Sequence, residues 1–271
     1  MTSLARISIL AVALIAAGAA LAADHSSQPT LAQVYQTLSS KRFVDLTHAF
    51  GPGIPHWKGF SDEKLKSVYE IPKDGFHADQ YTLVGQWGTH VDPPAHFHDG
   101  LHSVDQIDLK DMIAPLVVLD IHDAVAKNPD YVVTVQDVAR WESKHGRIPE
   151  HAFVALRTDW SKRWPSDAAM QNRDSQGISH YPGWSMEVLK LLYMERRIAA
   201  SGHETTDTDP GLATTKDDYS LESYVLGLNH FQIELLTNLD QIPEAGALVI
   251  ATFPKPQNGS GFPARVFAIL P

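Results

Sequence analysis

Residues 85–100, GQWGTHVDPPAHFHDG, gather four polar side chains and a double proline in one short stretch. The four side chains are Gln86, His90, Asp92 and His96. Imidazole and carboxylate groups are the ligands that Zn²⁺ and Mn²⁺ take in proteins, and an amide oxygen can join them. The stretch therefore predicts a site for a divalent cation.

The backbone of this stretch is expected to be extended. Two glycines lower the helix propensity of residues 81–92, and the double proline blocks continuation of a helix. Side chains two residues apart in a strand point to the same side, so Gln86, His90 and Asp92 should share a face. The chain then bends at the prolines, which lets His96 turn back over the same spot.

An exposed histidine-rich loop is the alternative interpretation, because His98 and His102 lie close by. A lone His-x-Asp pair would favour that loop. The intervening glycine, the double proline and the additional imidazole of His96 favour the metal site instead.

A strand alone cannot complete the coordination, so another ligand must come from elsewhere. Two later stretches are candidates: SGHETTDTDPG (201–211), which is rich in short polar side chains, and NHFQIELLTNLD (229–240). In the second stretch His230 and Glu234 are four residues apart. Glu234 lies among apolar residues, where an unpaired charge is costly. A metal ion or an arginine partner such as Arg157 or Arg265 would remove that cost.

The distribution of apolar residues predicts one mixed α/β domain. Apolar spacing and capping residues indicate helices, and short apolar runs bounded by turn residues indicate strands. Helices are expected over 30–39, over 134–146 and from 185 onward, and strands over 43–48, 115–121, 152–158, 247–253 and 264–270.

The N-terminal residues 1–22, MTSLARISILAVALIAAGAALA, have the layout of a signal peptide. Arg6 precedes an apolar core of about 15 residues, which is short of the roughly 20 that span a bilayer. Cleavage after Ala22 would leave residues 23–271 as an exported domain, periplasmic or secreted. A membrane anchor is the alternative.

Composition excludes several classes of function. The net charge of −10 disfavours nucleic acid and anionic membranes as partners. The chain has no cysteine, which excludes thiolate catalysis, disulfides and cysteine zinc sites. A small molecule is therefore the expected partner, and any metal must be held by His, Asp, Glu or amide groups.

Residues 86–96, QWGTHVDPPAH, resemble the H-x-G-T-H-x-D-x-P-x-H signature of the cyclase family. These metal-dependent hydrolases include bacterial kynurenine formamidases and isatin hydrolases. The resemblance extends from about residue 42 to the C-terminus, through DLTHAFGPGIPHWKG, FVALRTDW, GHETTDTDPG and the closing region from IELLTNLD onward. It implies a swivelling β/β/α domain that forms homodimers or larger assemblies.

The resemblance also implies roles for individual residues. His90, Asp92 and Glu234 match positions of metal ligands, and His96 matches the general acid/base. Trp57 falls where an aromatic residue lines the substrate pocket, and Phe60 or Trp87 could add to that surface.

The chain departs from the family pattern at two positions. Gln86 replaces the first signature histidine, and an amide oxygen is a weaker ligand than imidazole. Glu222 stands where two-metal members have a further histidine, for which His203 or His230 could substitute in space. These departures favour one Zn²⁺ or Mn²⁺ ion over two, with Gln86 as an additional ligand.

The expected reaction is hydrolysis of an amide, lactam or ester bond in a small cyclic or aromatic substrate by metal-activated water. His96 would transfer the protons. A serine hydrolase is disfavoured because no G-x-S-x-G motif is present. A non-catalytic binding protein, with a site decayed at Gln86, is the alternative from another class, although the retained His96 argues against it.

Two further pairs of polar residues lie near these motifs. His48 and His56 flank the Trp57 segment and could face the pocket. Asp207 and Asp209 are expected to hold a loop through local hydrogen bonds rather than to bind metal.

Overall fold

The computed structural model describes residues 28–271, so the expected signal peptide lies outside the described residues. The chain divides into two units between residues 38 and 39. Helix α1 (Leu31–Ser39) makes up most of the described part of the first unit. It begins as predicted, because the backbone N–H of Thr30 donates to Gln33 Oε1 (2.8 Å) and the Thr30 hydroxyl accepts from the Gln33 N–H (3.3 Å).

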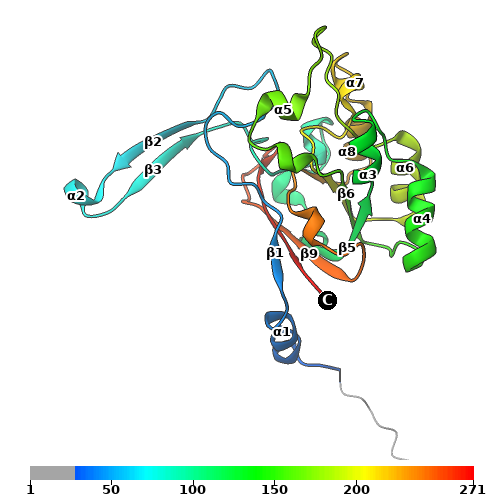
Figure 1. Cartoon of the computed structure of the whole chain (residues 1–271). Coiled ribbons are helices and arrows are strands. Elements are labelled where there is room, and N and C mark those ends of the chain that lie inside the picture. Colours follow the sequence, from blue (N-terminus) through cyan, green and yellow to red (C-terminus); the bar gives the residue numbers. More distant parts are fainter. Residues whose placement is uncertain (1–27) are drawn as a thin grey trace, which may run out of the picture. The chain divides into compact units, whose positions relative to one another are not determined.

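The second unit is built on a nine-stranded mixed sheet in the order β1-β11-β9-β5-β6-β7-β8-β4-β10 (Figure 1). Strands β5 to β8 are parallel, and the other pairs are antiparallel. The strands are β1 (Phe43–Asp45), β4 (His90–Asp92), β5 (Ile113–Asp120), β6 (Phe153–Arg157), β7 (Ala200–His203), β8 (Gln232–Glu234), β9 (Ala247–Thr252), β10 (Phe262–Pro263) and β11 (Arg265–Ile269).

Helices follow or precede the parallel strands. They are α3 (His122–Lys127), α4 (Val135–His145), α5 (Asp167–Gln171), α6 (Met186–Lys190), α7 (Gly211–Thr214) and α8 (Ser220–Gly227). A π-helical segment, Leu191–Arg196, extends α6. Short 3₁₀ turns lie at Pro94–His96, Val104–Gln106, Leu109–Met112, Trp160–Arg163 and Leu239–Gln241.

The central strands bury both of their faces, which explains their continuous apolar sequences. In β5, Val117 and Leu119 pack in the same core cluster as Val138 of α4. Leu116 and Val118 alternate with them and pack in a second cluster on the opposite face. The predicted mixed α/β domain is confirmed.

The structure confirms most of the predicted elements. Thr134 caps α4 as expected: its hydroxyl accepts from the Asp137 N–H (3.3 Å), and its own N–H donates to Asp137 Oδ2 (2.7 Å). The strands expected over 115–121, 152–158, 247–253 and 264–270 appear as β5, β6, β9 and β11.

The single extended segment expected over 81–92 is wrong. Strand β3 (Ala78–Thr82) ends before it, and the next strand, β4, has only three residues. Gly88 breaks the strand because its φ of +63° lies in the left-handed region. A Cβ at this position would also lie 2.8 Å from Phe50 Cβ.

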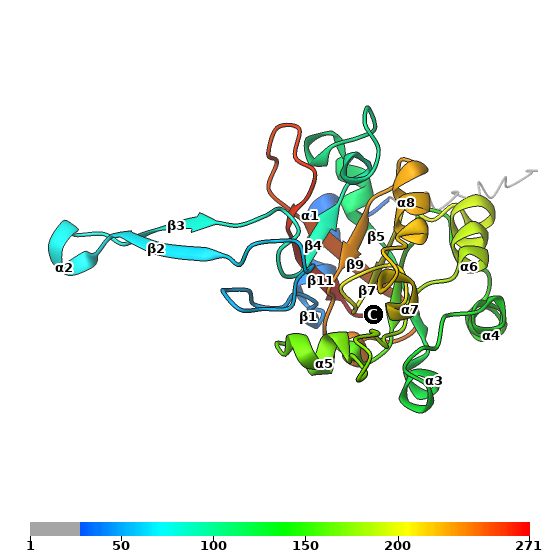
Figure 2. The ribbon, with the colours of Figure 1, turned by 90° about the horizontal axis from the view of Figure 1, so that it is seen from above.

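Strand β2 (Lys64–Tyr69) pairs with β3 in a separate antiparallel hairpin, and the short helix α2 (Ile71–Asp74) forms its tip. This hairpin extends away from the nine-stranded sheet (Figures 1 and 2). Among the described residues, no helix has the length and apolar character needed to span a bilayer.

Gly202 in β7 sets the distance between β7 and its neighbours. A Cβ there would lie 2.7 Å from Phe153 Cζ, 2.8 Å from Leu236 Cδ1 and 3.0 Å from the backbone oxygen of Ile233. The last of these atoms is backbone of β8 and cannot move without shifting that strand. Any larger residue would therefore push β8 outward.

We expect Gly202→Ala to lower the free energy of unfolding by about 2 kcal/mol, because it overpacks a dense core. Gly51→Ala is the matched control, since a Cβ there has nothing within 4 Å, and should change stability by less than about 0.5 kcal/mol. Urea denaturation measures both. Equal stability of the two variants would contradict this account of β7.

Candidate functional site

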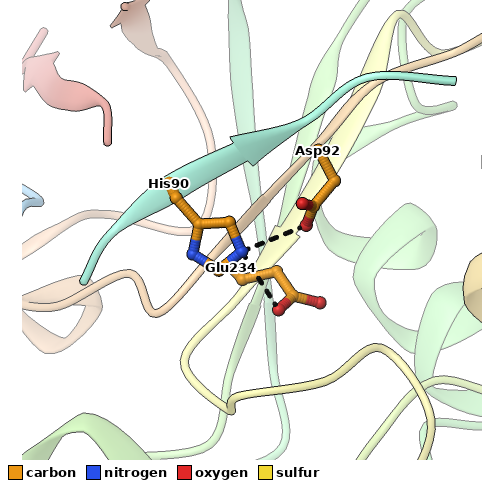
Figure 3. Close-up of side chains that lie close together, drawn as sticks. All are labelled: His90, Asp92 and Glu234. Carbon is orange, nitrogen blue, oxygen red and sulfur yellow. Dashed lines mark ion pairs between the residues drawn. The ribbon is translucent and has the colours of Figure 1, made fainter. Parts of the chain in front are cut away.

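Antiparallel pairing of β4 with β8 assembles the centre of the site. His90 lies directly opposite Glu234 in this register, and Asp92 is two residues further along β4. His90 Nε2 is 3.3 Å from Asp92 Oδ2 and 3.5 Å from Glu234 Oε2 (Figure 3). All three residues are buried. The predicted partners His90, Asp92 and Glu234 therefore meet.

The imidazole of His90 presents one specific nitrogen to the two carboxylates. Its Nδ1 lies 2.8 Å from the backbone oxygen of Gly88, to which it can only donate a proton. In the neutral ring, Nε2 then carries a free lone pair aimed at Asp92 and Glu234. This arrangement of backbone carbonyl, imidazole and carboxylates is typical of a metal-ligating histidine.

The Asp92 carboxylate has no hydrogen-bond partner for either oxygen within the described part of the chain. Burial alone would raise its pKa, but the charge and proximity of His90 hold the pKa of Asp92 at about 2. Burial lowers the pKa of His90, but Asp92 outweighs this and raises it, so without a metal the charged imidazole of His90 balances the carboxylate. A divalent ion bound at His90 Nε2 would take over that role.

Crowding of further carboxylates adds to this need for positive charge. Burial raises the pKa of both Glu222 and Glu234 well above the usual 4.5, and the negative charges of Asp92 and Asp207 raise both further. The charge of Glu222 also acts on Glu234. Bringing a divalent cation among these groups would let them ionise together. The donor set of buried carboxylates and imidazole therefore fits Zn²⁺ or Mn²⁺.

An arginine partner for Glu234 was the alternative, and it is wrong. Arg157 pairs with Asp120 and Asp159. Arg265 pairs with Asp45.

Glu234 is instead held by neutral donors. Gln232 Nε2 donates to Glu234 Oε1 (3.1 Å), and His203 Nε2 lies 3.2 Å from the same oxygen. The indole N–H of Trp184 donates to His203 Nδ1 (3.3 Å), which leaves the ring proton on Nε2. Burial lowers the pKa of His203 to about 3, so the ring is neutral. The remaining oxygen, Oε2, is thereby turned toward His90.

His96 lies beside this centre and shares Asp92 with it. Asp92, His96 and Glu222 form a second group whose ligand atoms lie within 4.8 Å of one another. His96 Nε2 is 3.9 Å from Glu222 Oε1. Burial lowers the pKa of His96, and the negative charge of Asp92 partly offsets this.

Gln86 presents its amide nitrogen to His96. This nitrogen donates to the backbone oxygen of Ser260 (2.6 Å) and lies 3.3 Å from His96 Nδ1. Because the amide N–H is a donor, Nδ1 accepts and the proton of the neutral ring sits on Nε2. Gln86 therefore lies in the site, although the segment between β3 and β4 that carries it is not the expected strand.

Of the three residues left open by the sequence, two join the site. Glu222, on α8, lines the cavity beside His96. His203, on β7, contacts Glu234 from behind. His230 does not join, because its Nδ1 lies 2.8 Å from the Ala199 backbone oxygen and its ring packs on Tyr193.

A cavity of about 410 Å³ opens over His90, Asp92 and Glu234. Its walls are largely aromatic: Trp57, Phe60, Phe97 and Tyr219 line it, together with His56. Trp57 Nε1 donates to the Tyr219 hydroxyl (2.8 Å), which joins two distant segments at the rim. Volumes of this size accept small organic molecules.

Trp87 is not part of this wall, contrary to one expectation. Its indole is fully buried and donates to Glu63 Oε2 (3.0 Å). His48 also lies elsewhere, stacked on Trp164 at 4.3 Å between ring centroids.

Sequence reasoning missed Tyr219 and Phe97, and it assigned Asp207 only a local role. Asp209 does hold its loop, accepting from the N–H groups of Leu221 and Glu222. Asp207, two residues earlier, accepts from Tyr181 and Thr206, and it also lines the cavity. In the segment TTDTD (205–209), Asp207 and Asp209 are two residues apart, and this spacing of carboxylates was the signal available for Asp207.

The raised pKa of Glu234 predicts how the metal-free protein responds to pH. Its folded carboxyl keeps a proton where the unfolded chain has lost it, so the free energy of unfolding should fall as pH rises above 4.5. We expect Glu234→Gln to remove this loss. At about pH 8 with a chelator it should be at least as stable as the wild type.

The same variant should no longer be stabilised by added Zn²⁺ or Mn²⁺, whereas a bound ion at 100 times its Kd stabilises the wild type by about 2.7 kcal/mol. Glu222→Gln is the matched control and should keep that gain. Thermal denaturation with and without metal measures both. If Glu222→Gln lost the stabilisation by metal while Glu234→Gln kept it, the ion would be held by the second group, Asp92, His96 and Glu222.

Proteins similar to this chain in sequence and fold include isatin hydrolases. Residues 44–210 match the family described as "Putative cyclase". Isatin hydrolase from Roseibium aggregatum is 32% identical over 84% of this chain and 91% of its own length. Isatin hydrolase A from Ralstonia solanacearum has the same fold, with 33% identity, a TM-score of 0.83 and coverage of 91% of this chain and 99% of that chain.

A second solved structure, an isatin hydrolase bound to the product analogue thioisatinate, is 31% identical with a TM-score of 0.82. The match covers 91% of this chain and 99% of that chain. Both the family match and the relative from Roseibium aggregatum extend through β4 and its signature. The expected hydrolase and its family are confirmed: this chain belongs to the cyclase family of metal-dependent hydrolases.

Proposed function

We propose that the protein hydrolyses the lactam of a small fused aromatic substrate of the isatin class. The observation that carries this proposal is the cavity whose floor is His90, Asp92 and Glu234 and whose walls are aromatic. The likeness to isatin hydrolases over most of the chain supports it. In the reaction, water adds a hydroxyl group to the carbonyl carbon, the ring C–N bond breaks and the nitrogen gains a proton.

We assign His90, Asp92 and Glu234 as the residues that hold one divalent ion, Zn²⁺ or Mn²⁺. When bound, such an ion supplies a Lewis acid that lowers the pKa of water and polarises the carbonyl. Glu234 is prepared for this role, because His203 and Gln232 occupy one of its oxygens and leave the other facing His90. Gln86 as a fourth ligand, and a second ion held by Glu222, stay predictions.

His96 is the proposed general acid/base, and Nε2 is the atom that transfers the proton. The amide of Gln86 occupies Nδ1, so proton exchange is left to Nε2. This nitrogen faces the cavity floor and lies 3.9 Å from Glu222, whose raised pKa favours a protonated carboxyl. With its proton on Nε2 the neutral ring can only donate there, so the base step requires the other tautomer, with the ring proton on Nδ1; His96 then takes a proton from water at Nε2 and returns it to the departing ring nitrogen.

The aromatic walls suit a flat substrate. Trp57 and Phe60 pack against each other with ring centroids 5.1 Å apart, and Tyr219 fixes the Trp57 indole by a hydrogen bond. Planar rings gain most from such surfaces when they stack in an offset or edge-to-face manner. We therefore assign Trp57 to substrate binding, with Tyr219 as the residue that holds it in place.

We further propose that the protein is exported and acts outside the cytoplasm, since residues 1–22 have the pattern of a signal peptide. A homo-oligomer is the proposed assembly. N-terminal sequencing of the protein recovered from the host's periplasm or medium tests export, and an intact Met1 there would count against cleavage.

We expect the purified protein to convert isatin into its ring-opened carboxylate, detected by chromatography and mass spectrometry as the addition of one water. His96→Ala should lower kcat by at least about 100-fold, because proton transfer by a positioned side chain contributes 10²–10⁴. It should leave the stabilisation by metal unchanged.

His98→Ala is the matched control. His98 lies on the same loop, but its Nε2 contacts the Ser223 backbone oxygen instead of the cavity. A His96→Ala variant as active as the control would refute the acid/base role. Absence of isatin turnover in the metal-loaded wild type would refute the proposed substrate class.

A further inference from the structure

A second cavity, of about 250 Å³, lies beside the cavity that opens over the candidate metal centre. The two cavities share three lining residues, Trp57, Asp207 and Tyr219. The rest of the second wall comes mainly from the end of α5, the segment 177–181 and the end of α7. We name this second space the side cavity, and no step proposed above for the hydrolysis uses it.

Gln171 is a buried amide in the wall of the side cavity. It is the last residue of α5 and leaves only 8% of its surface exposed. Its Oε1 accepts from the Ser179 hydroxyl (3.1 Å), and its Nε2 has no hydrogen-bond partner within the described part of the chain. Buried polar groups normally have their hydrogen bonds satisfied. The unpartnered N–H groups of Gln171 therefore point to a ligand with an acceptor atom.

Two cationic side chains, Lys58 and Arg173, line the same cavity. They lie close enough to interact, because the hydrogen bond and charge of Asp217 raise the pKa of Lys58 and the charge of Arg173 opposes this rise. Lys58 Nζ is 2.7 Å from Asp217 Oδ1. Arg173 is less engaged, since its Nη1 lies 3.9 Å from Asp167 Oδ2, beyond hydrogen-bond distance. The guanidinium of Arg173 can therefore turn to an anion in the cavity.

The balance of charge in the side cavity indicates a monoanion. Of the described residues that line it, Lys58 and Arg173 are cations and Asp207 is the one acid. The Tyr181 and Thr206 hydroxyls both donate to Asp207 Oδ2. Burial raises the pKa of Asp207, which favours its neutral form and weakens its opposition to an anion. A guanidinium and an amide N–H match the two oxygens of a carboxylate.

The size and walls of the side cavity restrict the remainder of the ligand. Its volume lies just below the roughly 300–1,000 Å³ of pockets that bind drug-sized molecules, so it accepts one small molecule. The indole of Trp57 and the phenol of Tyr219 line it, and their hydrogen bond holds both rings in place. Such a wall favours an aromatic ring on the ligand.

The proposed hydrolysis generates a molecule of this class. Opening of a fused lactam turns a neutral amide into an aromatic amine that carries a carboxylate. The wall that Trp57, Asp207 and Tyr219 share places the side cavity next to the space in which this carboxylate would form. The neutral substrate lacks the charge that Lys58 and Arg173 would attract.

We propose that the side cavity is a binding site for a small aromatic carboxylate. The Gln171 amide and the Arg173 guanidinium bind its oxygens, Lys58 adds positive charge, and the ring lies against Trp57. The ligand is either the carboxylate produced in the first cavity or one that enters from solution. Only the first of these two sources rests on the proposed function.

Isothermal titration calorimetry of the metal-loaded mature protein with sodium benzoate tests this site. Arg173→Gln and Gln171→Leu should each raise the Kd at least about 10-fold, because hydrogen bonds to a charged ligand are stronger than those between neutral groups. Gln171→Leu also leaves the Ser179 hydroxyl without its acceptor. Arg173 is exposed, so Arg173→Gln keeps the test valid if Gln171→Leu folds poorly.

Gln176→Leu and Lys162→Gln are the matched controls. Gln176 is an exposed amide on the same loop, and Lys162 is an exposed cation paired with two aspartates; neither lines the side cavity. Both should keep the wild-type Kd for benzoate. His90→Ala should keep it too, because His90 lies in the first cavity. An unchanged Kd in Arg173→Gln, loss of binding in His90→Ala or equally tight binding of inorganic phosphate would overturn the proposal.

Titration with the ring-opened product of isatin distinguishes the two sources. Binding of this product to His90→Ala, weakened in His90→Ala/Arg173→Gln, would identify the product as the ligand. Binding of benzoate without binding of the product would assign the site to a carboxylate from solution. Benzoate binding in a protein that does not turn over isatin would refute the proposed function and still support the side cavity.

Discussion

The pairing of β4 with β8 is the contact on which the rest of the site depends. It places His90 opposite Glu234 and brings Asp92 beside them in a buried space where, among the described residues, no arginine pairs with the carboxylates. Without a bound cation, the buried carboxylates of Asp92 and Glu234 repel each other, which favours a proton on one of them. The metal dependence of the family explains this arrangement, because a bound metal ion would compensate the negative charges of Asp92 and Glu234 that folding brings together.

The surroundings of these ligands show how the chain fixes them in advance. Gly88 supplies the carbonyl that sets the His90 tautomer, and Trp184 sets that of His203, which in turn holds Glu234. Gln86 does the same for His96. His90, Glu234 and His96 are therefore each oriented by a partner behind them, as a precise site requires, whereas Asp92 has no such partner among the described residues. Gly202 keeps the β7 and β8 backbones close enough for these contacts.

Local features of the sequence predicted much of this. The apolar runs of β5 and β6, the Thr134 cap and the spacing of His90 and Asp92 depend on near neighbours, and all were found where expected. The irregular path after β3 was missed, because glycine adopts positive and negative φ about equally readily and its presence at position 88 does not tell which it takes. Glu222 and His203 reach the site through the packing of α8 and β7, and spacing alone does not encode that. The β2–β3 hairpin was not predicted either, since its residues are exposed or half-buried and give no pattern of core positions.

The metal content of the purified mature protein tests the central claim most directly. Elemental mass spectrometry of the wild type beside His90→Ala should give about one equivalent of Zn or Mn per chain in the first and almost none in the second. One equivalent in both proteins would place the ion away from His90. No bound metal after dialysis against Zn²⁺ and Mn²⁺ would contradict the account altogether.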